Sequence, residues 1–131
     1  MEKYRINPHK GLEFGIYTLG DHLLNPQTGE RISAQQRIQE IIEMAQLAEQ
    51  AGIDFFSVGE SHQEYFTTQA HSVVLGAIAQ ATEKIKIGSS STIISTLDPV
   101  RVFEDFATID LISDGRTEII AGRASRVGLF D

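Results

Sequence analysis

The sequence contains no cysteine, no long apolar run and few basic residues. The lack of cysteine excludes disulfide bonds, thiolate metal sites and cysteine nucleophiles. No apolar run approaches the roughly 20 residues of a membrane-spanning helix, and the first residues lack the apolar core of a secretory signal, so we expect a cytoplasmic protein. The 11 basic residues are spread along the chain, and the net charge of −7 argues against a nucleic-acid partner. A small-molecule partner is the better expectation.

The composition is that of one globular domain. The chain has 131 residues, of which 41% are hydrophobic and 22% are charged, a balance typical of a packed, soluble protein. Residues 1–10 are polar, contain Pro8 and show no hydrophobic period, so we expect a flexible arm there. The remainder, up to Asp131, is expected to form one folded unit.

A short apolar run, residues 54–59, ends abruptly in Glu60, Ser61 and His62. The run consists mostly of strand-forming residues without polar alternation, which indicates a parallel strand buried on both faces. Where helices cover a sheet of parallel strands, ligands bind at the carboxyl ends of the strands. The polar triplet therefore marks a candidate site.

Three further segments have the period of helices. Ser33 with Gln36 is a capping-box pair that begins the first helix, and Gly52 supplies the left-handed residue that ends it. Apolar residues cover so much of the second helix that most of it, Val73 included, is expected to be buried, and Phe103 is assigned to the apolar face of the third. The expected helices span residues 33–51, 67–82 and 98–114.

Strands and helices alternate along the chain. Strands are predicted at residues 12–19, 54–59, 84–88 and 117–121, and a hydroxyl-rich run follows the third. Asp98 before Pro99 is a helix start, because the aspartate caps free backbone donors and proline has none to satisfy. The alternation predicts an α/β protein of repeated β-α-β units. Four such units fit a small open sheet or half of an eight-stranded β/α barrel, and periodicity alone does not choose between them.

Several motifs follow one another from Phe14 onward: Gly59–His62, Gly88–Ser91, Asp98–Arg101 with Glu104, Asp105 and Asp110, and Ser113–Arg116 leading to Gly122–Arg123. Together they resemble the motifs of the bacterial luciferase-like flavin monooxygenases. The family is built on an eight-stranded β/α (TIM) barrel, so the resemblance implies that residues 1–131 are the N-terminal half of such a barrel domain.

The resemblance also implies roles for individual residues. His62 matches the second histidine of the family's pair, which makes His62 and the neighbouring Glu60 the implied catalytic residues. Ser90 and Ser91 match a flavin contact where the family often has a cis peptide bond. Arg123 matches an arginine that binds the flavin phosphate, and a guanidinium suits this role because it makes two parallel hydrogen bonds to phosphate oxygens.

The implied activity is that of a flavin-dependent monooxygenase. Reduced FMN, supplied by a flavin reductase, would activate O2 for the oxygenation of a small organic substrate. Ser61 replaces the first histidine of the family's pair, which usually has the acid–base role, so a luciferase-type proton transfer is not implied. A deazaflavin-dependent oxidoreductase is a related alternative. A non-enzymatic flavin-binding or assembly module is another, and continuation of the coding sequence past Asp131 would favour the enzyme.

The same residues have plainer interpretations. Glu60 fits a structural pivot as well as a catalytic group, and without the resemblance His62 would be only a polar strand end. Glu60, His62 and Glu64 are not expected to bind a metal, because alternate residues on a turning loop rarely converge. Farther along the chain we interpret Arg101, Glu104 and Asp105 as a solvated or interhelical charge cluster. We interpret Asp110 and Arg116 as structural partners.

Half a barrel leaves its first and fourth strands as unpaired edges. Bare edges present free backbone donors and acceptors, and they invite association. We therefore expect a homo-oligomer, or terminal segments that cover the edges. We also expect residues 1–131 alone to bind flavin weakly or not at all, because the rest of the phosphate site in such proteins comes from later strands.

Overall fold

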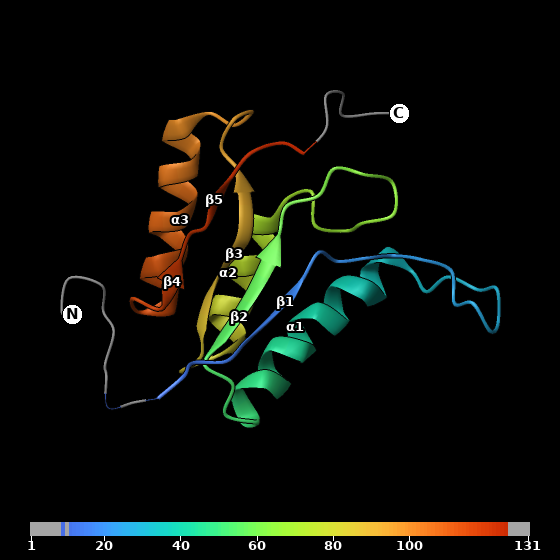
Figure 1. Ribbon diagram of the computed structural model, residues 1–131, viewed down its shortest axis with the longest axis horizontal. Helices are drawn as coiled ribbons and strands as arrows, with labels where there is room; N and C mark the ends of the chain where they lie inside the picture. Colours follow the sequence, from blue (N-terminus) through green and yellow to red (C-terminus); the bar gives the residue numbers. More distant parts are fainter. Residues whose placement is uncertain (1–8, 10, 126–131) are drawn as a thin grey trace.

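The computed structural model describes residue 9 and residues 11–125 (Figure 1), so the expected arm at residues 1–10 lies almost wholly outside the described residues. Strands and helices alternate, as the sequence predicts, up to the last strand, which is divided in two. The elements are β1 (Gly15–Thr18), α1 (Ala34–Gln50), β2 (Phe55–Gly59), α2 (His71–Ala81), β3 (Lys86–Ile93), α3 (Pro99–Ser113), β4 (Thr117–Glu118) and β5 (Ala121–Gly122).

The strands form one parallel sheet in the order β1-β2-β3-β4, with β5 also paired to β3. Figure 1 shows β2 and β3 pointing the same way, so their carboxyl ends share one edge. Alternate strand residues face the helices, because successive side chains of a strand point to opposite faces. The core between sheet and helices consists of Phe56, Val58, Ile85 and Ile87 from the strand segments and Ile41, Ala45, Ala48, Val74, Leu75, Ile78, Ala79, Phe106 and Ile109 from the helices.

The predicted fourth strand, residues 117–121, is divided into β4 and β5. The cause is a side chain of β3 that takes part in the backbone pairing. Ser89 Oγ donates to the carbonyl of Ile120 (3.3 Å) and accepts from its N–H (3.0 Å). A side chain thus replaces a regular ladder contact between the two short strands.

The local helix signals are mostly confirmed. Ser33 Oγ accepts from the N–H of Gln36 (3.1 Å), but the Gln36 side chain donates to Glu40 (3.1 Å), so only half of the capping box forms. Asp98 caps α3 by accepting from the two backbone N–H groups of residues 100 and 101. Gly52 is left-handed, with φ +78°, as predicted after α1.

Other expectations about the helices and strands are wrong. The second helix begins at His71, four residues after Thr67, and β3 continues to Ile93, so the hydroxyl run lies inside the strand. Val73 and Phe103, expected to be buried, are each 72% exposed. A helix packs only where a neighbouring layer exists, and no such layer covers these outer faces within the described residues.

Arg116 connects the end of α3 to the loop between α2 and β3. Its Nε donates to Ser113 O (2.7 Å), Nη1 to Thr82 Oγ1 and Ile85 O, and Nη2 to Ala79 O and Thr82 O. All five N–H donors of the guanidinium therefore have partners. Arg116 is structural, as interpreted from the sequence, although its partners are mostly backbone carbonyls.

Two carboxylates near Arg116 accept hydrogen bonds from backbone N–H groups. Asp110 accepts from the N–H of Thr117 (3.2 Å). Glu49 accepts from three successive N–H groups, those of residues 83, 84 and 85. Burial on its own raises the pKa of Glu49, but the three hydrogen bonds, with the nearby Arg116, outweigh it and lower the pKa below its ordinary value.

Candidate active site

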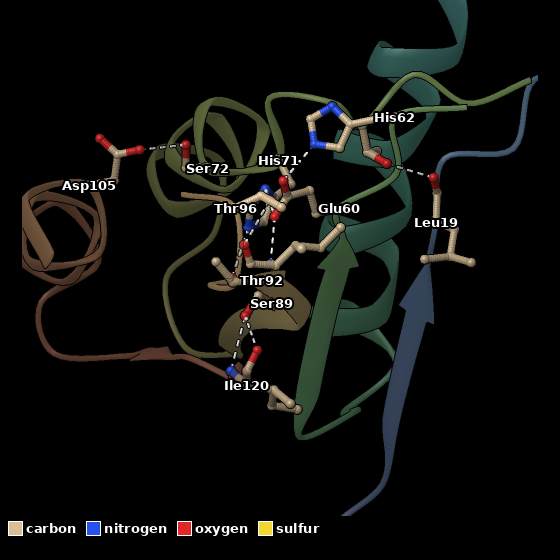
Figure 2. A network of polar contacts seen from close by, with 12 residues as sticks. Leu19, Glu60, His62, His71, Ser72, Ser89, Thr92, Thr96, Asp105 and Ile120 are labelled. Carbon is tan, nitrogen blue, oxygen red and sulfur yellow. Dashed lines mark hydrogen bonds and ion pairs between the residues drawn. The ribbon is translucent and has the colours of Figure 1, made fainter. Parts of the chain in front are cut away.

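Glu60 is a buried carboxylate directly after β2, and its two oxygens have different partners (Figure 2). Oε2 accepts from the backbone N–H of Ile93 (2.7 Å), at the end of β3. Oε1 lies 2.6 Å from Nε2 of His62. A carboxylate only accepts hydrogen bonds, so Nε2 of His62 carries the hydrogen. The Nδ1 of His62, whose side chain is 32% exposed, is then left to accept a hydrogen bond or a proton.

The backbone of β3 is irregular at Ser90. Val58 pairs with Ser89, whereas Gly59 pairs with Ser91, so Ser90 is an extra residue in β3, a β-bulge. No peptide bond is cis within the described residues, so the cis peptide expected at Ser90–Ser91 is wrong. The irregularity is therefore one extra residue in β3, between two positions that pair with β2.

The bulge also changes which side chains face the helices. Ser89 and Thr92 are both fully buried although they are three residues apart, a spacing that places them on opposite faces of a regular strand. Ser90 Oγ is the buried side-chain oxygen that has no hydrogen-bond partner within the described residues. It lies against Gly59, where an added Cβ would be only 2.8 Å from it.

His71, at the start of α2, was missed by the sequence analysis. Its Nε2 lies 2.9 Å from Thr92 Oγ1, and its Nδ1 lies 3.9 Å from Glu60 Oε2. Burial lowers the pKa of His71, and it outweighs the raising effect of Glu60. One available signal was the lone histidine in a mostly apolar helix. The partners of His71 are distant in the sequence, so no spacing pattern revealed them.

A small cavity lies over this network, with a volume of about 190 Å³. It is lined by residues of the strand ends, the start of α2 and the first turns of α3. Asp105, on α3, accepts from Ser72 Oγ (2.8 Å), which confirms its interpretation as an interhelical contact, while Arg101 and Glu104 form an exposed ion pair (3.0 Å). The polar lining includes Glu60, His62, Gln69, His71, Ser72, Thr92 and Asp105.

The remaining predicted site residues are less closely joined. Ser91 contacts Glu60 through the backbone, because its carbonyl accepts from the Glu60 N–H (3.1 Å). Ser61 is half-buried beside them. Arg123 follows β5, which is parallel to β3, and is therefore at the same edge of the sheet. It is exposed, and its Nη1 donates to Ala124 O (3.1 Å), with no described contact to the other site residues.

The arrangement suits acid–base chemistry. Among the residues that the structure describes, no three His, Asp or Glu side chains are grouped to hold a metal ion. A buried carboxylate that orients an imidazole is a recurrent means of placing one basic nitrogen toward a reacting group.

No helix in the described part of the chain is long and apolar enough to cross a membrane.

The fold is of the β/α-barrel class, with parallel β/α units that correspond to part of such a barrel. The family of luciferase-like monooxygenases matches residues 12–127, and the chain belongs to this family. It is 30% identical over 97 residues to the N-acetyl-S-alkylcysteine monooxygenase of Bacillus subtilis (strain 168), covering 73% of this chain and 29% of that protein. It is 28% identical over 101 residues to the oxygenase component of a flavin-dependent trigonelline monooxygenase from Acinetobacter baylyi, covering 73% and 28%.

Solved structures are similar as well. Apo-MsnO8 has a TM-score of 0.78 at 27% identity, over 88% of this chain and 34% of that one. The oxygenating constituent of 3,6-diketocamphane monooxygenase from Pseudomonas putida, in complex with FMN, has a TM-score of 0.75 at 19% identity, over 87% and 30%, which shows the fold alone. The coenzyme F420-dependent tetrahydromethanopterin reductase of Methanopyrus kandleri has a TM-score of 0.65 at 27% identity, over 84% and 26%. The chain spans about a third or less of the length of these relatives.

Proposed function

We propose that this chain is the N-terminal part of a flavin-dependent monooxygenase that oxygenates a small organic substrate. The observation that carries the proposal is the Glu60–His62 pair, a buried carboxylate 2.6 Å from a partly exposed imidazole at the carboxyl edge of a parallel sheet. Family membership supports the reaction class. Flavin, when bound in reduced form, supplies the electrons that activate O2.

The residues present fit a flavin at this edge. Ser90 Oγ is buried and has no hydrogen-bond partner among the described residues, and a hydroxyl in this condition needs a polar ligand atom or water. We assign Ser90 and Ser91 to the flavin ring and Arg123 to the flavin phosphate. Because the Arg123 side chain is exposed and, within the described residues, makes a local hydrogen bond to Ala124, it is available to an anionic group.

In this proposal the protein does three things. Glu60 fixes the orientation of the His62 ring, so that Nδ1 faces the reacting groups. His62 then accepts or returns a proton at Nδ1, and the positive charge on the ring is stabilised by the carboxylate on its other side. The strand ends and the first turns of α2 and α3 keep bulk water from Glu60, which strengthens this electrostatic contact.

Binding of FMN tests the proposal. The whole gene product is expected to bind reduced FMN under anaerobic conditions, and Ser90→Ala is expected to weaken binding about fivefold, the loss of one net hydrogen bond. Thr96→Ala, an exposed hydroxyl beyond β3, is the matched control and is expected to leave the affinity unchanged. Residues 1–131 alone are expected to bind weakly or not at all. Equal affinities for the wild type and Ser90→Ala would contradict the assignment of Ser90.

A deazaflavin-dependent reductase is the second candidate, because a reductase that depends on coenzyme F420 is among the structural relatives. The same anaerobic titration with reduced coenzyme F420 separates the two, since a preference for the deazaflavin would replace FMN in the proposal. A non-enzymatic module of the same fold would bind flavin without forming an oxygenated product. A flavin reductase is the proposed partner of the monooxygenase, on the likeness to an oxygenase component, and the cytoplasm remains its predicted compartment.

We further propose that the chain associates with itself. Strand β1 pairs only with β2 within the described residues, and it exposes large apolar side chains beside its free edge. Phe14 is 64% exposed and Tyr17 is 68% exposed. Sedimentation velocity of residues 1–131 is expected to show a dimer or a larger species, and a single monomeric species at all concentrations would contradict the proposal.

A further inference from the structure

Glu60 lies between two imidazoles that differ in burial (Figure 2). The side chain of Glu60 is 1% exposed, that of His62 is 32% exposed and that of His71 is 5% exposed. The proposed function uses only the outer imidazole. The inner one, His71, lies near the other oxygen of the same carboxylate, Oε2. The role argued for it here deepens the proposed function and rests on it.

The contacts of His71 define how its ring is used. Nε2 is 2.9 Å from the hydroxyl of Thr92, which is fully buried, and Nδ1 is 3.9 Å from Glu60 Oε2. A carboxylate attracts the ring nitrogen that carries hydrogen, so Nδ1–H faces Glu60 and Nε2 accepts from Thr92. The distance of 3.9 Å between Nδ1 and Oε2 is too long for a hydrogen bond, so the contact with Glu60 is electrostatic.

We propose that His71 is a positioning residue: as a neutral imidazole behind Glu60, it holds the carboxylate in place. The negative charge of Glu60 then stabilises a protonated His62, so that protons exchanged at the cavity bind to His62 and not to His71. The step is a simple proton transfer. An O–H bond of water or substrate breaks, an N–H bond forms at Nδ1 of His62, and Glu60 compensates the new charge.

The surroundings of His71 favour the neutral ring. Burial lowers its pKa below the ordinary value of 6.5, and the charge of His62 lowers it further, whereas Glu60 and Asp105 raise it. The other close neighbour from α3 is the ring of Phe106, with centroids 6.1 Å apart, which adds no charge. Of two imidazoles that share one carboxylate, the more exposed one pays the smaller desolvation cost when it is protonated.

The test is a histidine titration by NMR on the 15N-labelled chain, which has four histidines that single variants assign. In His62→Gln the titration midpoint of His71 is expected to rise by about half a pH unit, because a neighbouring positive charge is removed. In Glu60→Gln the midpoint is expected to fall, because the compensating carboxylate is lost. In the wild type the ring signals of His71 should show the Nδ1–H tautomer at neutral pH.

The electrostatic coupling between His71 and His62 should also be visible in the NMR signals of His62. The His62 signals are expected to show a second, small inflection at the pH where His71 titrates, and this inflection should vanish in His71→Gln. His22→Gln is the control, because His22 binds the carbonyl of Ile32 (2.6 Å) in a separate loop, and it should leave His71 unchanged.

A His71 that is not coupled electrostatically to the Glu60–His62 pair would give a different result. Its midpoint would be the same in the wild type, His62→Gln and Glu60→Gln, and this outcome overturns the proposal. If His71→Gln does not fold, the His62→Gln arm still decides, because it reads His71 itself. The titration needs no flavin, so loss of coupling and loss of flavin binding are separate outcomes.

Discussion

Arg116→Ala is expected to lower the free energy of unfolding by about 3–5 kcal/mol, enough to unfold much of the protein at room temperature if its stability is ordinary. The guanidinium donates five hydrogen bonds, four of them to backbone carbonyls at the ends of α2 and α3 and before β3. Alanine leaves those carbonyls without partners in a part-buried place. Urea denaturation followed by circular dichroism measures the loss.

Two further variants make this test specific. Arg116→Lys is expected to recover only part of the stability, because an ammonium has three donors and lacks the planar fork. Arg101→Ala removes an exposed arginine whose ion pair, within the described residues, is with Glu104 on the same helix, and it should unfold close to the wild-type midpoint. Similar midpoints for Arg116→Ala and Arg101→Ala would show that Arg116 does not hold these elements together.

Glu60→Gln is expected to reduce flavin-dependent product formation by the whole gene product about 100-fold, the lower range of a general acid–base contribution. Glutamine keeps the shape and can still accept the N–H of Ile93, so the fold should persist. It cannot stabilise a charged His62, and its amide can turn either its oxygen or its NH2 group toward Nε2, so the ring loses its fixed orientation. Steady-state turnover with reduced flavin and O2 is the measurement.

Glu64→Gln is the matched control for this experiment. It is an exposed carboxylate in the same loop, four residues after Glu60, and it should retain wild-type turnover. A Glu60→Gln variant that keeps more than about half of the activity would contradict a role of Glu60 in proton transfer. Circular dichroism of both variants distinguishes lost chemistry from lost structure.

Local signals in the sequence predicted much of the fold correctly. Ser33 and Asp98 cap helices because a short polar side chain accepts hydrogen bonds from free backbone donors two or three residues away. Neighbouring residues of the sequence therefore suffice to predict these caps. The alternation of apolar segments likewise predicted the parallel sheet. Burial was less predictable, since Val73 and Phe103 are apolar but face outward, and hydrophobicity does not tell which side of a helix has a neighbour.

The candidate site was only partly predictable. Glu60 and His62 are two residues apart, so a strand that ends in polar residues drew attention to both. His71 and Thr92 contribute from α2 and β3, and their contact joins residues 21 apart in the sequence. The resemblance pointed to Ser90 and Ser91 as a position where the family often has a cis peptide bond, whereas the described backbone has a β-bulge there and no cis bond.

The sequence by itself determined the order of strands and helices, most of their limits, the family and the polar end of β2, because these depend on residues close along the chain. Only the tertiary structure decided that a buried carboxylate lies close to both a partly exposed and a buried imidazole. Such a network depends on strand register, and one extra residue in β3 changes which side chains meet. Register is settled by the packing of the whole sheet against its helices, which no single segment specifies.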